Sequence, residues 1–395
     1  MIAILVWSGL AVAALGHGLL WLGAANRMHG LGLPRRLVKL VTPLGAAAAI
    51  ALFVILARRF VNRGAEPFNP FVVGDAISYY LWICASIGAT SFLVKPWGES
   101  RRYDRSVLQH WTADRRDLVK SLGRRPVHSL KSKLLCALPF NEALTLSIDR
   151  KKLALPRLPS ELEGLTIVHL SDLHMMGDPS QEFFDYMVRQ VNDLRPDVIA
   201  LTGDVIEEPE CYPWVHETLA KLCAPLGVYF VLGNHDTFID VRRTLDELGQ
   251  AALIHVGGRM IRADWNGAAV TLIGNEAPWL PAPKLADLPP RRSGADEFRM
   301  VLAHSPDRFA WGQKVDADLV LAGHTHGGQI QLPILGVVAS PSLYGAYYAC
   351  GVFRRGDTVL HVSRGVSGET PLRWRCPPEI ALLELTRLQQ DDEKS

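Results

Sequence analysis

Five short polar motifs contain the side chains of this 395-residue chain that could bind metal ions. One of them, Asn234, His235 and Asp236, directly follows the apolar run at 227–233. Alone, this motif fits a polar turn, since Gly-Asn is a common turn dipeptide. In each motif, a carboxylate, an amide or an imidazole comes directly after an apolar run. The candidate metal ligands are Asp172, His174, Asp204, Asn234, His304, His324 and His326.

The ligand types indicate which metals could bind. Carboxylate and amide oxygens mixed with imidazoles suit Mn²⁺, Fe²⁺ or Zn²⁺ and disfavour a thiolate or all-oxygen site. A carboxylate can bridge two ions about 3.5–4 Å apart, which is the separation used in phosphoester hydrolysis. Each motif is weak by itself, and His304 alone fits a buried, hydrogen-bonded histidine. The five together favour one common site.

Strands and helices that alternate along residues 165–326 must position these motifs. The apolar runs at 165–170, 197–204 and 227–233 predict strands, and residues 179–194 space their apolar side chains at helical intervals. This alternation predicts an α/β fold. Ligands of α/β sheets bind at the carboxyl ends of strands, so we expect the five motifs to meet at one edge.

The order of the motifs, D-x-H, GD, GNH[DE], H and GHxH, resembles that of the calcineurin-like metallophosphoesterases. All five are present between residues 165 and 326. The flanking sequences "LPRLPSELEGLTIVHLSDLH", "LAHSPD", "LAGHTHGGQIQLP" and "PLRWRCPPEI" are similar to the membrane-anchored bacterial subgroup and extend the resemblance to residues 145–385. One departure is "DLHMMG", where the glycine comes three residues after the histidine instead of two.

The resemblance implies two mixed β-sheets flanked by helices, a four-layer αββα sandwich. It implies a site for two divalent ions, with Asp204 as the bridging ligand. The first ion would be held by Asp172, His174, Asp204 and His326, and the second by Asp204, Asn234, His304 and His324. Water activated by the ions would attack phosphorus in line with the leaving oxygen. His235 is then expected to act as a general acid or charge stabiliser, with Asp236 orienting its ring.

Two arginines near the end of the chain, Arg364 and Arg373, are candidates for binding substrate anions, because a guanidinium matches phosphate oxygens bidentately. A structural salt bridge is the alternative for each arginine. The segment at 327–336 follows the last ligands and is expected to line the groove, although its glycines could simply serve a turn.

Three apolar stretches, Ile2–Ala25, Leu37–Ala57 and Ala76–Val94, are each near the ~20 residues that a transmembrane helix needs. A cleaved signal peptide is disfavoured, because the first five residues carry no basic side chain and the first apolar run is too long. We therefore expect a multi-pass protein of the inner (cytoplasmic) membrane. The loop after the first stretch and residues 95–133 are the more basic, which predicts a cytoplasmic catalytic domain.

The charge distribution divides the chain in the same way. Residues 1–150 have a balance of +11 and residues 151–395 a balance of −9. We expect a transmembrane helical region at 1–95, a basic juxtamembrane linker at 96–143, a metallophosphoesterase domain at 144–386 and a polar tail at 387–395. The acidic catalytic part argues against nucleic acid as a partner, and no obligate protein partner is evident.

Two classes of function remain open at this stage. The first is an enzyme that hydrolyses phosphodiester or pyrophosphate bonds, with a lipid-linked substrate such as a UDP-diacylglucosamine-type pyrophosphate. The alternative is a non-catalytic metal-binding membrane protein with a structural or regulatory role. The presence of His235, which is not needed as a ligand, favours the enzyme.

Overall fold

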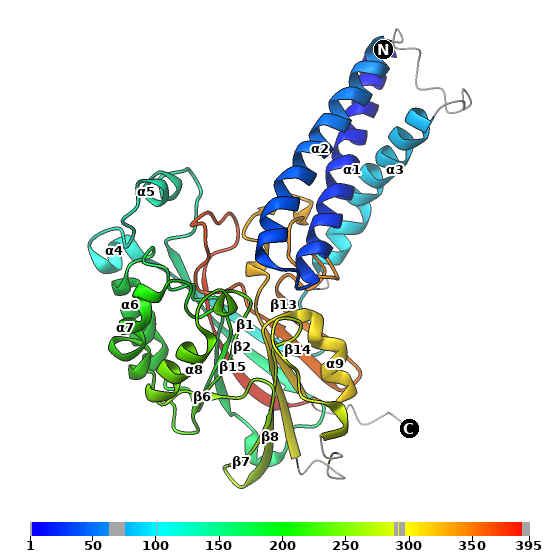
Figure 1. Cartoon of the computed structure of the whole chain (residues 1–395). Helices are drawn as coiled ribbons and strands as arrows, with labels where there is room; N and C mark the ends of the chain where they lie inside the picture. The colour runs from blue at the N-terminus through cyan, green and yellow to red at the C-terminus, as the bar shows by residue number, and fades with distance from the viewer. Residues whose placement is uncertain (1, 63–75, 101, 288–290, 292–296, 389–395) are drawn as a thin grey trace, which may run out of the picture. The chain divides into compact units, whose positions relative to one another are not determined.

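The computed structural model describes residues 2–62, 76–100, 102–287, 291 and 297–388. The chain divides into two compact units (Figure 1). Unit 1 consists of residues 1–101 and 331–347, and unit 2 consists of residues 102–330 and 348–395.

Unit 1 contains three long helices that occupy the three apolar stretches. They are α1 (Ile2–Gly30), α2 (Arg35–Asn62) and α3 (Ala76–Ser100). α1 and α3 pack so closely that a Cβ on Gly16 would lie 1.7 Å from the carbonyl oxygen of Cys84. Glycine at this position permits the close approach. Among the described residues, Trp7–Gly30 and Arg36–Arg58 are long and apolar enough to cross a membrane. The third predicted span, within α3, stays a prediction.

Unit 2 is built around two β-sheets. The seven-stranded sheet has the order β1 (Leu108–Asp117), β2 (Thr145–Leu155), β15 (Glu379–Arg387), β3 (Thr166–Leu170), β4 (Val198–Thr202), β5 (Val228–Val231) and β6 (Ile254–His255). The six-stranded sheet has the order β13 (Gly351–Arg355), β14 (Thr358–Val362), β10 (Leu319–Ala322), β9 (Glu297–Ala303), β8 (Ala268–Asn275) and β7 (Met260–Trp265). Both contain parallel and antiparallel pairs.

Helices cover the outer faces of the two sheets. The helices of unit 2 are α4 (Leu118–Leu122), α5 (Leu130–Cys136), α6 (Gln181–Asp193), α7 (Tyr212–Glu217), α8 (Val241–Gln250) and α9 (Phe309–Lys314). Figure 1 shows α6, α7 and α8 on one side of unit 2 and α9 on the other.

Three hydrophobic clusters define the layers. One contains Ile167 of β3 and Leu321 of β10, so the two sheets pack face to face. A second joins Val168 of β3 to Phe183 of α6, and a third joins the other face of the six-stranded sheet to Phe309 of α9. Neighbouring strand residues point to opposite faces, and both faces are buried here, which is why these strands are apolar throughout. The predicted four-layer αββα sandwich is confirmed.

The segment at 96–143, which the sequence predicts to be a linker, contains a strand of the main sheet. β1 pairs with β2 from Leu108 to Asp117, and the Asp117 carboxylate then caps α4. Nine of the ten residues of β1 are exposed, so the strand lacks the apolar alternation that marks a half-buried strand. Unit 2 thus begins at residue 102 instead of 144. Of the polar tail predicted at 387–395, residues 389–395 lie outside the described part of the chain.

Candidate metal centre

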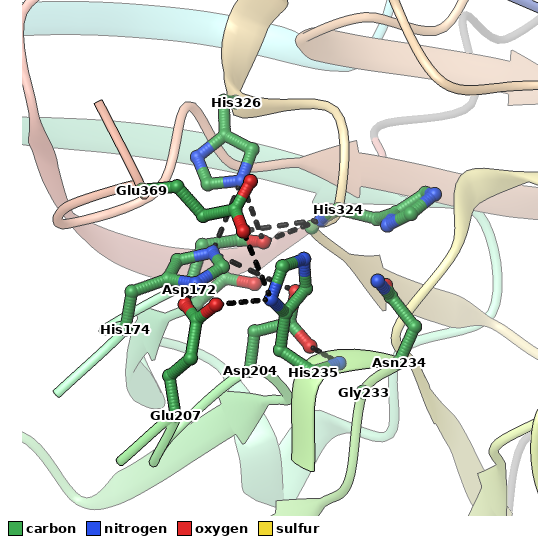
Figure 2. Close-up of polar contacts among 12 residues, drawn as sticks. Asp172, His174, Asp204, Glu207, Gly233, Asn234, His235, His324, His326 and Glu369 are labelled. Atoms are coloured by element: carbon green, nitrogen blue, oxygen red, sulfur yellow. Dashed lines mark hydrogen bonds and ion pairs between the residues drawn. The ribbon is translucent and has the colours of Figure 1, made fainter. Parts of the chain in front are cut away.

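Five strands of unit 2 deliver the candidate ligands. β3, β4 and β5 are parallel neighbours, as are β9 and β10, so their carboxyl ends lie at the same edge of each sheet. The structure brings all seven predicted ligands together at these ends. They are Asp172 and His174 after β3, Asp204 after β4, Asn234 after β5, His304 after β9, and His324 and His326 after β10. Figure 2 labels all of them except His304.

The ligands form two groups. In the first, His326 Nε2 lies 3.5 Å from Asp172 Oδ1 and 3.2 Å from His174 Nε2. In the second, His304 Nε2 lies 3.1 Å from His324 Nδ1 and 3.0 Å from Asn234 Oδ1. Each group offers three His or Asp ligand atoms within 4.8 Å of one another, the second including Asp204.

Asp204 lies between the two groups. Its Oδ2 atom is 3.6 Å from His174 Nε2 and 3.1 Å from His304 Nε2. Asp204 Oδ1 accepts a hydrogen bond of 2.8 Å from the backbone N–H of His235. One carboxylate therefore faces both groups, as a bridging ligand must.

The hydrogen bonds of the first group determine which imidazole nitrogens could bind a cation. His174 Nδ1 lies 2.9 Å from Glu207 Oε2, and His326 Nδ1 lies 3.1 Å from the carbonyl oxygen of Ser367. Both oxygens act as acceptors here, so each Nδ1 carries a proton and Nε2 is the nitrogen of each ring that could bind a cation. The two Nε2 atoms face each other at 3.2 Å, so one cation could bind both rings.

The second group has the same character. His304 Nδ1 lies 2.7 Å from the carbonyl oxygen of Thr202, so Nε2 is the nitrogen that could bind a cation once the ring has lost a proton. His304 Nε2 faces His324 Nδ1 and Asn234 Oδ1. His324 Nε2 is buried without a hydrogen-bond partner in the described structure. The nitrogen and oxygen atoms of both groups thus fit as ligands of divalent cations.

The electrostatics keep the carboxylates ionised. Burial alone would raise the pKa of Asp204, but the imidazoles of His304 and His235 hold it well below its usual range. Burial lowers the pKa of His326 to about 4, which keeps its imidazole neutral. Burial also opposes protonation of His304, but Asp204 raises the pKa of His304 to about 9. Metal binding at His304 would therefore release a proton.

The partner of His235 differs from the one that the sequence predicts. Asp236 is fully buried, and its carboxylate accepts hydrogen bonds from four backbone N–H groups. Those groups belong to Asp204, Val205, Ile206 and Gly233. The ring of His235 instead contacts Glu207 Oε1, at 2.9 Å from Nδ1, with Glu369 Oε1 at 3.9 Å. The predicted role of Asp236 in orienting His235 is thus corrected.

Glu207 is the residue that the sequence reasoning missed. Its two carboxylate oxygens contact His174 Nδ1 and His235 Nδ1, so it joins a candidate ligand to the candidate acid (Figure 2). Burial would lower the pKa of His235, but Asp204 and Glu207 raise it to about 9. His235 is therefore protonated at neutral pH. Its position in the sequence could have indicated this role, since Glu207 comes three residues after Asp204, beyond the end of the same strand.

The backbone at the ligands is strained. Five of the seven candidate ligands have a positive φ, between 45° and 69°, and they are Asp172, His174, Asp204, His324 and His326. Such conformations cost energy and concentrate at functional sites. Gly233 permits the closest approach, because a Cβ there would lie 2.2 Å from Asp204 Oδ1. These turns hold the ligands in place before any metal binds.

The two arginines that could have bound substrate anions are buried in the protein. Arg364 Nη2 lies 3.1 Å from both carboxylate oxygens of Asp149. Arg373 Nη1 donates to the carbonyl oxygen of Arg364 at 2.8 Å, and Arg373 Nη2 donates to that of Ser367. The geometry favours the structural alternative, in which Arg373 supports the carbonyl group that orients His326.

Comparison with known proteins gives the same result as the geometry. The profile of the family "Calcineurin-like phosphoesterase" matches residues 165–328. An uncharacterized metallophosphoesterase of Bacillus subtilis, YkuE, is 32% identical over 235 residues, which are 58% of this chain and 81% of that protein.

Two further relatives have named activities. The UDP-2,3-diacylglucosamine pyrophosphatase LpxG of Chlamydia trachomatis is 26% identical over 301 residues, covering 60% of this chain and 88% of that protein. The phosphodiesterase YaeI of Escherichia coli is 29% identical over 236 residues, covering 55% of this chain and 81% of that protein.

Proposed function

The chain belongs to the calcineurin-like phosphoesterases, and on this basis we propose that it hydrolyses a phosphodiester or pyrophosphate bond with two divalent metal ions. Membership of the family makes it a metal-dependent hydrolase of phosphoric esters. The observation that supports the dinuclear proposal is the pair of ligand groups on either side of Asp204, each with imidazole nitrogens that face one another.

The seven ligands divide between the two ions. Asp172, His174, Asp204 and His326 would hold one ion, and Asp204, Asn234, His304 and His324 would hold the other. When bound, the ions supply Lewis acidity to the phosphate oxygens and lower the pKa of a water molecule. The mixture of oxygen and imidazole ligands suits Mn²⁺, Fe²⁺ or Zn²⁺.

His235 would supply the proton for the leaving oxygen. Its Nδ1–H is directed at Glu207, which leaves Nε2 as the atom that can donate to substrate. The ring is partly exposed and protonated, whereas Glu207 is buried. Proton transfer of this kind is typically worth about 10²–10⁴-fold in rate.

The substrate that we propose is linked to a lipid, and the catalytic unit faces the cytoplasm at the inner membrane. Two helices are apolar and long enough to cross a bilayer, which supports membrane association. The chlamydial relative is named for hydrolysis of a pyrophosphate bond in a diacylated nucleotide sugar. A UDP-diacylglucosamine-type pyrophosphate is therefore the first substrate to test.

The test uses the full chain in detergent, loaded separately with Mn²⁺, Fe²⁺ or Zn²⁺. We expect hydrolysis of bis-p-nitrophenyl phosphate, and about two bound ions per chain by elemental mass spectrometry. Asp204→Asn should lower both the metal content and the rate. One ion per chain in a fully active protein would refute the dinuclear site, and inertness with every metal would refute the activity. Hydrolysis of UDP-2,3-diacylglucosamine in mixed micelles then tests the substrate separately.

A further inference from the structure

Helix α5 of unit 2 exposes apolar side chains and buries a polar one, which is the reverse of a normal surface helix. Leu130 and Leu134 in the helix and Leu138, two residues after its end, recur every four residues and are 72%, 63% and 47% exposed. Phe140, just beyond the helix, is 82% exposed, whereas Ser132 is buried. A surface helix of a soluble domain normally buries its apolar stripe. We call Leu130, Leu134, Leu138 and Phe140 the α5 patch.

The α5 patch is held in this orientation by specific contacts. Ser129 caps the helix by accepting from the backbone N–H of Ser132, and its hydroxyl donates to Asp178 at 2.6 Å. Beyond the helix, Asn141 Nδ2 donates to the carbonyl oxygens of Leu135 and Pro371, both at 2.8 Å. Hydrogen bonds at both ends of the segment therefore fix the helix that carries the exposed leucines.

The sequence around the α5 patch is basic. Residues 118–140 contain five Lys or Arg residues and no Asp or Glu. The five are Lys120, Arg124, Arg125, Lys131 and Lys133. Arg124 forms an ion pair with Glu182. Lys131 and Lys133 lie between Leu130 and Leu134 in the sequence. Apolar side chains with basic residues beside them match the surface of a membrane that contains anionic lipid.

We propose that the α5 patch docks unit 2 on an anionic bilayer surface, with its leucines and Phe140 at the boundary between head groups and acyl chains. The inference rests on the proposed membrane association and extends the proposed function. The apolar helices of the same chain provide the reason to choose a bilayer over a protein partner, because they would keep unit 2 close to one.

Docking of the α5 patch would place the metal centre at the membrane surface. Next to Phe140, Asn141 binds Pro371 and also accepts from the backbone N–H of Arg373. The same loop contributes Ser367, whose carbonyl oxygen orients His326. The edge of the site would then receive phosphoesters that are carried in the bilayer.

The experiment places a fluorescent label on one introduced, exposed cysteine at a time, in the full chain in nanodiscs of phosphatidylcholine and phosphatidylglycerol. Cys136 and Cys223, the two cysteines that are not buried, are first replaced by serine. Labels at Leu134→Cys and Phe140→Cys are compared with a label at Ile254→Cys, an exposed apolar position on β6. Quenching by doxyl-labelled lipid should lower the emission at 134 and 140 by about twofold or more and leave 254 nearly unchanged.

A label at Leu20→Cys in α1 separates the possible failures. If Leu20 is quenched and positions 134 and 140 behave like 254, the docking proposal is wrong and the membrane span stands. If Leu20 is not quenched either, membrane association fails and the docking proposal fails with it. Hydrolysis of bis-p-nitrophenyl phosphate by the same samples tests the phosphoesterase activity independently of both.

Discussion

At the scale of single residues, Glu207 offers the sharpest test of how the site is organised. Its carboxylate accepts from the rings of His174 and His235, so Glu207→Gln would replace one acceptor oxygen by a donor group. Loss of such a partner typically lowers metal affinity or activity by about 10- to 100-fold. We expect losses of this size in both, measured by metal titration and by the rate on bis-p-nitrophenyl phosphate. Glu208→Gln, at the exposed neighbouring position, should change neither.

Asp236 should matter for stability more than for proton transfer. Asp236→Ala would leave four backbone N–H groups without their acceptor in a buried place. Unsatisfied buried donors are costly, so we expect a loss of roughly 3 kcal/mol in the free energy of unfolding. Asp240→Ala is the matched control, because the Asp240 carboxylate caps α8 through one N–H and should cost about 1 kcal/mol. Equal midpoints of unfolding for the two variants would refute this role of Asp236.

At the scale of elements, the turn after β5 tolerates no side chain at Gly233. A Cβ there would lie 2.2 Å from Asp204 Oδ1, so Gly233→Ala must displace the proposed bridging ligand. We expect metal content and hydrolysis to fall together by at least about tenfold. Gly249→Ala in α8 is the control, since its Cβ would have no neighbour within 4 Å and helical Ala is favoured. A Gly233→Ala protein with normal metal content would show that Asp204 can be held in another way.

The sequence predicted best the elements that are buried on both faces. β3, β4, β5, β9 and β10 are short apolar runs that end in a polar motif, so both their existence and their ends were visible. β1 was not recognised, because it is an exposed edge strand and its residues carry no apolar alternation. Its pairing with β2 depends on a contact between distant parts of the chain, which local pattern does not reveal.

The candidate site shows the same division. The positions of the ligands followed from the motifs, but the partners of His235 and Asp236 did not. Spacing alone places Asp236 next to His235, whereas the structure turns its carboxylate toward the backbone after β4 and uses Glu207 for the ring. Arg364 was ambiguous for a similar reason, since its partner Asp149 lies 215 residues earlier.

At the scale of the whole molecule, the distribution of basic residues predicts how the chain crosses the membrane. The last turn of α1 contains Arg27, and Arg36 and Lys39 lie near the start of α2. Loops rich in Lys and Arg stay on the cytoplasmic side. With three spans, we expect the N-terminus outside, the chain between the second and third spans outside, and unit 2 in the cytoplasm. The two apolar helices that qualify as spans support only the first part of this topology.

Fusions to alkaline phosphatase and green fluorescent protein test both the orientation and the third span. A fusion after Ser395 should give an inactive phosphatase and a fluorescent protein, because phosphatase folds only outside the cytoplasm and the fluorescent protein only within it. A fusion after Glu66, between α2 and α3, should give the opposite pair of results. The same result at both positions would mean that α3 does not cross the bilayer. An active phosphatase after Ser395 would place the metal centre outside and exclude substrates that are confined to the cytoplasmic leaflet.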